Sequence, residues 1–375
     1  MSRWICSQIG AREHYAIPRA LQISERLDRV FTDLHRPGLE SIPSNRVTKF
    51  PIGGAKWWWQ LRSGGGHELF IEQGKWFSEA ILAKLERDDV TETTFFGYDT
   101  GFLEAATHLK ERGAKAVVGQ IDPGRFEFDL VEQERLRWPG WENSPHIPEG
   151  YHWRREQEWE VADQIIVNSE WSRDALIEQG VADKKIEVIP LCYEAPSEPS
   201  APRRGVPGNT LEILWLGQVN LRKGIPYLIE AARKLPSGRF RFTVAGPITV
   251  EPKAVASLPS NVEFVGPVSR SRVSRLYAKA HVFILPTLSD GFAITQLEAM
   301  AHGLPVVTTR CCGKVVNDGV NGFLIEPRRV DQIVDRLVEI YENPSRWEEL
   351  SFNAIQRSKD FQLKHLSRDL LELGR

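Results

Sequence analysis

Residues 286–309, PTLSDGFAITQLEAMAHGLPVVTT, decide the fold of the second half of the chain. They hold the end of one strand, a glycine-bearing turn, one helix and the next strand, which is the pattern of a parallel α/β sheet. Apolar side chains recur at helical spacing after the turn, and Gly303 followed by Pro305 ends the helix. We therefore predict a helix that begins near Phe292 and faces a bound ligand.

Two acidic residues frame this turn and helix. Asp290 stands just before Gly291, and Glu298 lies inside the helix, with seven residues between the two acids. The free N–H groups at the helix start, from Phe292 to Thr295, favour an anion. A carboxylate one turn further in repels phosphate but accepts hydrogen bonds from sugar hydroxyls. The pair therefore predicts a binding site for ribose or hexose beside phosphate. The alternative interpretation is that both acids only complement the helix dipole.

The composition indicates an ordinary globular protein. The 375 residues suffice for about two domains, and 41% are hydrophobic and 26% charged. A formal net charge of -2 provides no basic field, so we expect no nucleic-acid partner. The apolar runs are far shorter than the ~20 residues of a membrane span, and the N-terminus lacks a signal peptide's apolar region. We expect a cytoplasmic protein.

The cysteines suggest no metal site. Cys6, Cys192, Cys311 and Cys312 form neither a C-x-x-C pair nor a cysteine–histidine cluster of metal spacing. We interpret the neighbouring thiols at 311 and 312 as inert and assign them no role. No D-x-D motif stands at a plausible strand end, so we predict no obligatory metal.

The first domain, residues 1–193, begins with a βαβ pattern. Residues 3–8 and 29–34 are the predicted strands, with a helix between them. The connecting loop starts at Gly10 and includes His14, where an open α/β sheet places ligands. A capped helix start is the alternative interpretation of this loop.

The pattern breaks between residues 43 and 77, which hold two glycine clusters and the tandem Trp57-Trp58-Trp59. We predict a long irregular insertion. Three successive tryptophans cannot share one face of a helix or strand, so at least one must find another surface, a substrate or a lipid interface. Core packing is the alternative for most of the tryptophan surface. Nearby basic residues leave open a peripheral contact with an anionic inner-membrane surface: Arg46, Lys49, Lys56 and Arg62.

A later strand of the first domain, residues 115–121, ends in the turn Asp122-Pro123-Gly124. Gln120 and Asp122 would face a ligand at that carboxyl end, although Asp before Pro-Gly is also plain turn chemistry. We expect residues 127–159 to cover the sheet with helices and residues 164–191 to complete it.

Residues 194–209 contain four prolines and no periodic apolar pattern, so we predict an interdomain linker. A second α/β domain follows over residues 210–345. The last helices, residues 346–375, are expected to cross back to the first domain.

Several blocks resemble GT-B glycosyltransferases, in particular the large retaining group usually called family 4. WLGQVNLRKGIPYLIEAARKL (215–235) is similar to its strand-loop-helix with Arg and Lys, and SDGFAITQLEAMAHGLPVV (289–307) to its E-x7-E block. NDGVNGFLIEP (317–327) resembles the following turn, and residues 162–191 resemble the last strands of the first domain. The resemblance covers residues 160–345 well, whereas residues 1–160 share only the βαβ layout. It implies two Rossmann-like domains with parallel sheets facing each other across a cleft.

The resemblance also implies roles for individual residues. Arg222 and Lys223 would stabilise a diphosphate leaving group, because two cations opposite a helix N-terminus suit such an anion. Asp290 would bind the donor sugar and Glu298 the ribose, with turn amides on the sugar or β-phosphate. The full set of predicted donor-binding residues is Gly10, Gly217, Arg222, Lys223, Asp290, Gly291, Phe292, Ala293, Ile294, Thr295 and Glu298.

Three features depart from the family pattern. The first acid is Asp290 instead of Glu, one methylene shorter, and Ala293 stands where a further glycine is frequent. The family often places a histidine after a middle strand of the first domain. Here that region is GQIDPG, so Gln120 or Asp122 would have to substitute, and His14 is another candidate for catalysis.

The predicted activity is retaining transfer of a sugar from a UDP- or GDP-sugar to an acceptor hydroxyl, as in polysaccharide, glycolipid or lipopolysaccharide-type biosynthesis. The acceptor is left open between a saccharide, a lipid-linked sugar and a small metabolite. One alternative is a GT-B nucleotide-sugar 2-epimerase, and a second is a non-catalytic sugar-nucleotide-binding protein.

Overall fold

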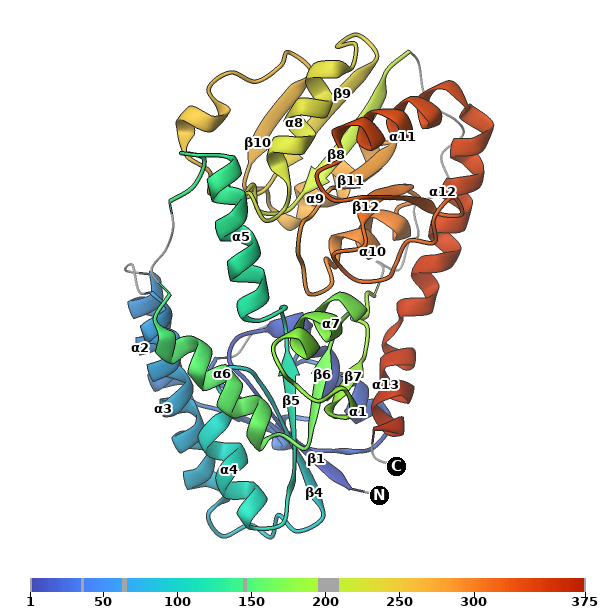
Figure 1. The fold of residues 1–375 in the computed structure, drawn as a ribbon. Coiled ribbons are helices and arrows are strands. Elements are labelled where there is room, and N and C mark those ends of the chain that lie inside the picture. The colour runs from blue at the N-terminus through green and yellow to red at the C-terminus, as the bar shows by residue number, and fades with distance from the viewer. Residues whose placement is uncertain (1, 35–36, 63–65, 144–146, 195–208, 374–375) are drawn as a thin grey trace. The chain divides into compact units, whose positions relative to one another are not determined.

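The strands predicted in the two halves of the chain pair into two separate parallel sheets, which Figure 1 shows in the computed structural model. The structure describes residues 2–34, 37–62, 66–143, 147–194 and 209–373. The chain divides into two compact units, the first with residues 1–125, 145–192 and 363–375, and the second with residues 126–144 and 193–362. Most of the predicted linker 194–209 lies outside the described residues.

The first unit contains a seven-stranded sheet with the order β3-β2-β1-β4-β5-β6-β7. Its strands are β1 (Arg3–Gln8), β2 (Leu27–Thr32), β3 (Val47–Lys49), β4 (Thr93–Tyr98), β5 (Lys115–Gln120), β6 (Gln164–Val167) and β7 (Ile186–Val188). All neighbouring strands pair in parallel. The chain adds strands outward from β1 to β3 on one side of the sheet and from β4 to β7 on the other, so the direction of strand addition reverses between β1 and β4. Open α/β sheets bind ligands at such a switch point, outside the carboxyl ends of the strands.

Helices cover both faces of this sheet. One face buries α1 (Ala16–Ile23) and the C-terminal α13 (Leu363–Glu372). The other face buries α3 (His67–Leu85), α4 (Leu103–Glu111), α6 (Glu149–Val161) and α7 (Glu170–Glu178). The hydroxyl of Ser367 on α13 donates to the Ala20 carbonyl on α1 at 2.9 Å, so the end of the chain packs on the first unit.

The described residues between 43 and 77 are mostly in regular elements, so the prediction of an irregular insertion is wrong for them. They form the short strand β3, the helix α2 (Pro51–Arg62) and the first half of α3. The glycines at 53 and 54 lie inside α2, where they allow close packing. A Cβ on Gly53 would lie 1.9 Å from the Trp76 ring, and one on Gly54 would lie 2.8 Å from the Asp33 carbonyl oxygen.

The second unit contains a six-stranded sheet with the order β10-β9-β8-β11-β12-β13. Its strands are β8 (Leu211–Leu216), β9 (Phe240–Ala245), β10 (Val262–Gly266), β11 (Val282–Leu285), β12 (Val306–Thr309) and β13 (Gly322–Ile325). Its helices include α8 (Ile225–Lys234), α9 (Arg270–Lys279), α10 (Thr295–Ala301), α11 (Val330–Glu342) and α12 (Pro344–Ser358). The switch point of this parallel sheet lies between β8 and β11.

Short 3-10 helices connect several elements: η1 (Arg12–Tyr15), η2 (Ser44–Arg46), η3 (Asp183–Lys185), η4 (Pro252–Val255) and η5 (Lys359–Phe361). The first of them follows β1 and contains consecutive residues with positive φ, Glu13 at 50° and His14 at 51°, followed by Tyr15 at 59°. Such left-handed conformations cost non-glycine residues free energy and persist only where the surroundings hold them.

Helix α5 (Arg125–Arg137) clusters with the second unit, although its position in the sequence predicts that it covers the first sheet. Its Glu134 carboxylate accepts hydrogen bonds from the Tyr227 hydroxyl at 2.6 Å and the Arg328 Nε at 2.5 Å. The Trp138 ring, just beyond the helix, meets Tyr227 edge to face at 5.8 Å. These contacts fix α5 on α8 and on the loop before α11.

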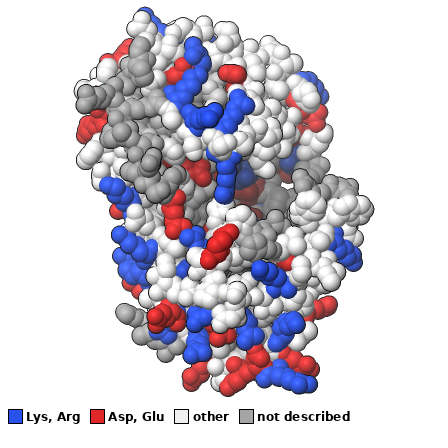
Figure 2. All heavy atoms as spheres, turned by 180° about the vertical axis from the view of Figure 1, so that it is seen from behind, with Lys and Arg blue, Asp and Glu red and all other residues white. Residues whose placement is uncertain are grey.

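Acidic and basic side chains are mixed over the face that Figure 2 shows. In the described part of the chain, no helix is both long and apolar enough to cross a bilayer.

Candidate functional site

The predicted cations meet the predicted acid at the switch point of the second sheet. The loop after β8 carries Arg222 and Lys223, and the loop after β11 carries Asp290. The Leu288 amide donates to the Arg222 carbonyl at 2.8 Å, which ties the two loops together. Because both loops leave the carboxyl ends of neighbouring strands, residues far apart in sequence come into contact at one edge of the sheet.

Each of the two cations has a fixed environment. The Arg222 guanidinium donates to the Ser289 carbonyl at 2.9 Å and lies 3.4 Å from a carboxylate oxygen of Glu127. The Lys223 ammonium is buried and forms an ion pair with Asp290. Burial, together with the neighbouring Arg222, holds the pKa of Lys223 well below its ordinary value. A further anion between the two cations would relieve this repulsion.

The turn after Asp290 differs from its prediction. Helix α10 begins at Thr295, three residues later than the expected start near Phe292. Ala293 has a left-handed φ of 62°, and the Phe292 carbonyl accepts from the Gly313 amide at 3.1 Å and the Gln296 Nε2 at 3.0 Å. That carbonyl is therefore engaged outside the helical hydrogen-bond pattern.

The conformation of this turn explains one departure from the family pattern. A glycine adopts positive φ without strain, whereas an alanine does not. Position 293 is thus where a glycine would be favoured, and this chain places Ala293 there. Among the described residues, the amides of Gly291, Ala293, Ile294 and Thr295 have no protein hydrogen-bond acceptor.

Glu298 lies in α10 beside an aromatic pair. Its Oε2 accepts from the Tyr277 hydroxyl at 2.8 Å, and the Tyr277 ring stacks on His302 with centroids 4.8 Å apart. Burial raises the pKa of Glu298, and the bond from Tyr277 opposes this rise. The carboxyl is thus oriented by one partner and retains a second oxygen for a ligand hydroxyl.

Sequence reasoning missed Glu127 and Tyr277 as members of this site. The Glu127 carboxylate accepts from the Ser289 hydroxyl at 2.7 Å as well as lying near Arg222. No signal in the sequence connects Glu127 to these loops, because α5 precedes them by a long stretch of chain. Tyr277 is a buried residue of α9, and the sequence did not indicate its contact with Glu298.

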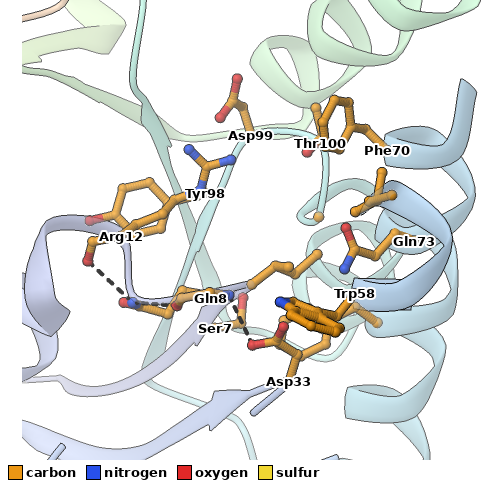
Figure 3. A pocket seen from close by; sticks show the side chains of 15 residues that line it. Ser7, Gln8, Arg12, Asp33, Trp58, Phe70, Gln73, Tyr98, Asp99 and Thr100 are labelled. Atoms are coloured by element: carbon orange, nitrogen blue, oxygen red, sulfur yellow. Dashed lines mark hydrogen bonds between the residues drawn. The ribbon is translucent and has the colours of Figure 1, made fainter. Parts of the chain in front are cut away.

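The first unit has a cavity of about 250 Å³ at its own switch point, shown in Figure 3. The ends of β1, β2 and β4 contribute Gln8, Asp33 and Tyr98, while α2 and α3 contribute Trp58 and Gln73. The predicted Gly10 lines this cavity with φ 74°, and its amide donates to Asp33 Oδ1 at 2.9 Å.

The other first-unit candidates lie in different surroundings. Asp122 forms an ion pair with the buried Arg155 and accepts from the Gly124 amide at 2.9 Å, which is the turn geometry considered as an alternative. Gln120 is buried and accepts from the Trp159 indole at 2.8 Å. His14 is exposed on η1 and does not line the cavity.

The three tryptophans lie in three environments, which agrees with the prediction that they cannot all share one face. Trp57 is buried against Trp76, with ring centroids 6.4 Å apart. Trp58 lines the cavity, and Trp59 is 67% exposed.

The paired cysteines are buried thiols. Burial raises the pKa of both Cys311 and Cys312 to about 11, so both are protonated at neutral pH. Within the described residues, no group of three or more His, Cys, Asp or Glu side chains is placed to hold a metal ion.

Comparisons with known proteins support the resemblance. The family model described as glycosyl transferases group 1 matches residues 210–343. The D-inositol 3-phosphate glycosyltransferase of Kribbella flavida is 30% identical over 231 residues, which are 55% of this chain and 54% of that protein. The chain thus matches about half the length of such curated relatives.

Solved structures resemble the whole chain. Sucrose-phosphate synthase of Thermosynechococcus elongatus has a TM-score of 0.70 at 16% identity, covering 99% of this chain and 98% of that chain. Anabaena HepE in complex with UDP and glucose has a TM-score of 0.65 at 15% identity, covering 100% and 99%. The fold is therefore GT-B, with two Rossmann-like domains built on parallel sheets, as the sequence predicts. The match of residues 210–343 to the glycosyl transferases of group 1, together with these relatives and structures, confirms the predicted resemblance to GT-B glycosyltransferases of that group.

Proposed function

We propose that this protein transfers a glycosyl group from a nucleoside diphosphate sugar to an acceptor hydroxyl, with retention of configuration and without an obligatory metal. The observation that carries this proposal is the meeting of Arg222, Lys223 and Asp290 at one switch point. Two cations beside a carboxylate suit a diphosphate joined to a polyhydroxylated sugar. The family match over residues 210–343 supports the assignment.

In the proposed donor complex, the diphosphate occupies the space beside Arg222 and Lys223. Its charge offsets the repulsion between these two cations, and the unpaired amides after Asp290 supply further donors. Asp290 accepts hydrogen bonds from the sugar hydroxyls, and Glu298 accepts from the ribose through the oxygen that Tyr277 leaves available. The donor is a UDP- or GDP-sugar. HepE, solved with UDP and glucose, makes UDP-glucose the first donor to test.

The chemical step breaks the bond between the anomeric carbon and the β-phosphate oxygen. The acceptor oxygen forms the new bond on the same face, and its proton passes to the departing phosphate. Arg222 and Lys223 favour this step because negative charge on the leaving diphosphate grows as the bond breaks. Asp122 and His14 have no assigned part in this step, since one is ion-paired in a turn and the other is exposed outside the cavity.

We place the product in polysaccharide, glycolipid or lipopolysaccharide-type biosynthesis, with the protein in the cytoplasm. The relative from Kribbella flavida is named for D-inositol 3-phosphate, but only about half of its length is matched. The acceptor of the present chain is therefore assigned from its own residues and not from that name.

The full-length protein, incubated with UDP- and GDP-sugars and a cell extract as the acceptor source, is expected to release nucleoside diphosphate in an acceptor-dependent manner. Release without acceptor and formation of a 2-epimer would instead support the epimerase alternative. Binding of a donor in calorimetry with neither transfer nor hydrolysis under any condition would leave a non-catalytic binder and defeat the proposal.

We also propose a peripheral contact between α2 and an anionic membrane surface. Ile52 is 89% exposed and Trp59 is 67% exposed, and the side chains of Lys49 and Lys56 are exposed beside them. Apolar side chains next to cations are the pattern of an interfacial helix. The double variant Ile52→Ala/Trp59→Ala is expected to co-sediment with phosphatidylglycerol vesicles about tenfold less than the wild type.

The control for the membrane contact is Leu136→Ala, which removes an apolar side chain that is 84% exposed on α5. This variant should bind the vesicles as the wild type does. If the wild type itself stays in the supernatant with these vesicles at low salt, α2 does not contact anionic lipid.

A further inference from the structure

The cavity of the first unit contains a buried polar side chain without a partner. Gln73 on α3 is only 5% exposed, and no residue that the structure describes forms a hydrogen bond with its amide. Figure 3 shows this amide pointing into the hollow between Tyr98 and Trp58. This amide offers two N–H donors and one acceptor oxygen to a ligand in the cavity. A ligand that both donates and accepts hydrogen bonds would satisfy it.

Two further lining residues have an acceptor atom with no partner in the described part of the chain. They are Gln8, through Oε1, and Asp99, through Oδ1. Both side chains are almost completely buried, at 2% and 3% exposure. Their other polar atoms are engaged, since Gln8 Nε2 donates to the Gly10 carbonyl at 3.1 Å and Asp99 Oδ2 pairs with Arg155 at 2.9 Å. Unpaired acceptors beside a cavity favour a ligand rich in hydroxyl donors.

Aromatic side chains line the same cavity. Trp58 from α2 and Phe70 from α3 lie on one side, and Tyr98 from β4 lies on the other (Figure 3). A sugar or cyclitol ring has an apolar C–H face, which packs on an aromatic ring, while its hydroxyls point to the edges. Polar groups at the edge and aromatic rings on the faces together match such a ring.

The charges at the cavity disfavour a phosphorylated ligand. Asp33 and Asp99 both line it, and a phosphate would be repelled by their carboxylates. The lining cation, Arg12, already lies over the Tyr98 ring with its guanidinium carbon 5.7 Å from the centroid. The loop that carries Arg12 is held in place because Tyr98 donates a hydrogen bond to Glu13 at 2.8 Å.

We propose that this cavity binds an uncharged polyhydroxylated ring, a sugar or a cyclitol, as the accepting end of the acceptor, and that Gln73 and Trp58 determine its specificity. This inference rests on the proposed function, since it assigns the acceptor of that reaction. Helices α2 and α3 supply both specificity residues, so the segment that broke the sequence pattern forms the wall of the acceptor site.

The test measures binding to the full chain without donor, by saturation-transfer NMR and calorimetry. The uncharged probes are the methyl glycosides of glucose, galactose, mannose and N-acetylglucosamine, together with myo-inositol. The charged probes are glucose 6-phosphate and inositol 1-phosphate. At least one uncharged ring is expected to bind about tenfold more tightly than its phosphorylated counterpart, because the carboxylates of Asp33 and Asp99 line the cavity and would repel the phosphate.

Matched variants distinguish the cavity from other surfaces. Trp58→Ala is expected to lower the affinity for the bound probe about tenfold. Trp59 is an exposed neighbour on the same helix, and Trp59→Ala is expected to leave this affinity within about twofold. Gln73→Leu keeps the volume of the side chain and removes its hydrogen bonds, so we expect a loss of about tenfold or more. Circular dichroism melting of each variant controls for folding.

Three results would overturn the inference: phosphorylated rings that bind as tightly as uncharged ones, no uncharged ring that binds at millimolar concentration, or equal effects of Trp58→Ala and Trp59→Ala. Donor binding is measured separately with UDP-sugars. If the donor binds and transfer proceeds only to a phosphorylated acceptor, the proposed function stands and this inference fails. If no donor binds but the ring does, the proposed function fails and the cavity assignment stands.

Discussion

Replacing Arg222 by alanine is expected to lower kcat/KM for sugar transfer by about 10²–10³-fold, the effect of removing one preorganised donor from a developing oxyanion. The guanidinium is held in place before any ligand binds, because it donates to the Ser289 carbonyl at 2.9 Å and lies near Glu127. Its removal leaves Lys223 as the remaining cation beside the proposed leaving group. Initial rates of UDP release with saturating acceptor measure this effect.

The matched control for Arg222 is Arg241→Ala. Arg241 is also an arginine of the second unit that pairs with a carboxylate, Glu212 at 2.7 Å, but it is 50% exposed. This variant should retain kcat/KM within about twofold, because surface ion pairs contribute little. Undiminished turnover of Arg222→Ala would remove Arg222 from the diphosphate site.

The sequence was sufficient for most of the strands and for the contact among Arg222, Lys223 and Asp290 in the second unit. Strands buried on both faces form continuous apolar runs, so β1 could be predicted with its observed limits, 3–8, and β2 to within two residues. In the second unit, loops after adjacent parallel strands must meet at one edge of the sheet. The contact between Lys223 and Asp290 follows from this rule together with the strand order.

The parts that could not be predicted depend on tertiary contacts. Glycines 53 and 54 resemble a loop in sequence, but they lie inside α2 because Trp76 and the Asp33 backbone leave no room for a Cβ. Helix α5 packs on the second unit through Glu134, whose partners Tyr227 and Arg328 are remote in sequence. Neither feature has a periodic signal of its own.

The first-unit cavity has one part that the sequence could predict and one part that depends on tertiary contacts. Its floor comes from the strand ends, where Gln8 and Asp99 could be placed by strand order alone. Its wall comes from α2 and α3, which the glycine and tryptophan content of the sequence concealed. The proposed donor site was therefore accessible to sequence reasoning, whereas the proposed acceptor site required the packing of these two helices.

Replacing Glu158 by alanine is expected to destabilise the first unit by about 3–5 kcal/mol, because it leaves several buried amides without an acceptor. Glu158 on α6 is fully buried and accepts from the amides of Thr100 at 2.7 Å, Phe102 at 3.1 Å and Leu103 at 3.2 Å. It thereby caps the start of α4 and fixes the Asp99–Gly101 side of the cavity. The unfolding transition of the first unit in calorimetry measures the loss, with Glu156→Ala, an exposed acid on the same helix, as the control.

The pH dependence of the same substitution tests the charge state of Glu158. Burial outweighs Arg154 and the amides and raises the pKa of Glu158 from 4.5 to about 7. The pKa of Glu158 is thus higher in the folded than in the unfolded protein. Its protonation therefore stabilises the fold fully below pH 4.5. This contribution to the free energy of unfolding is lost as the pH rises toward 7, by about 1 kcal/mol per pH unit. The wild type should therefore lose stability relative to Glu158→Gln between pH 5 and pH 7, and the cost of Glu158→Ala should be larger at pH 5 than at pH 8. A stability difference between wild type and Glu158→Gln that stays constant over this range would show that Glu158 is ionised in the folded protein, and that the amides and Arg154 outweigh its burial.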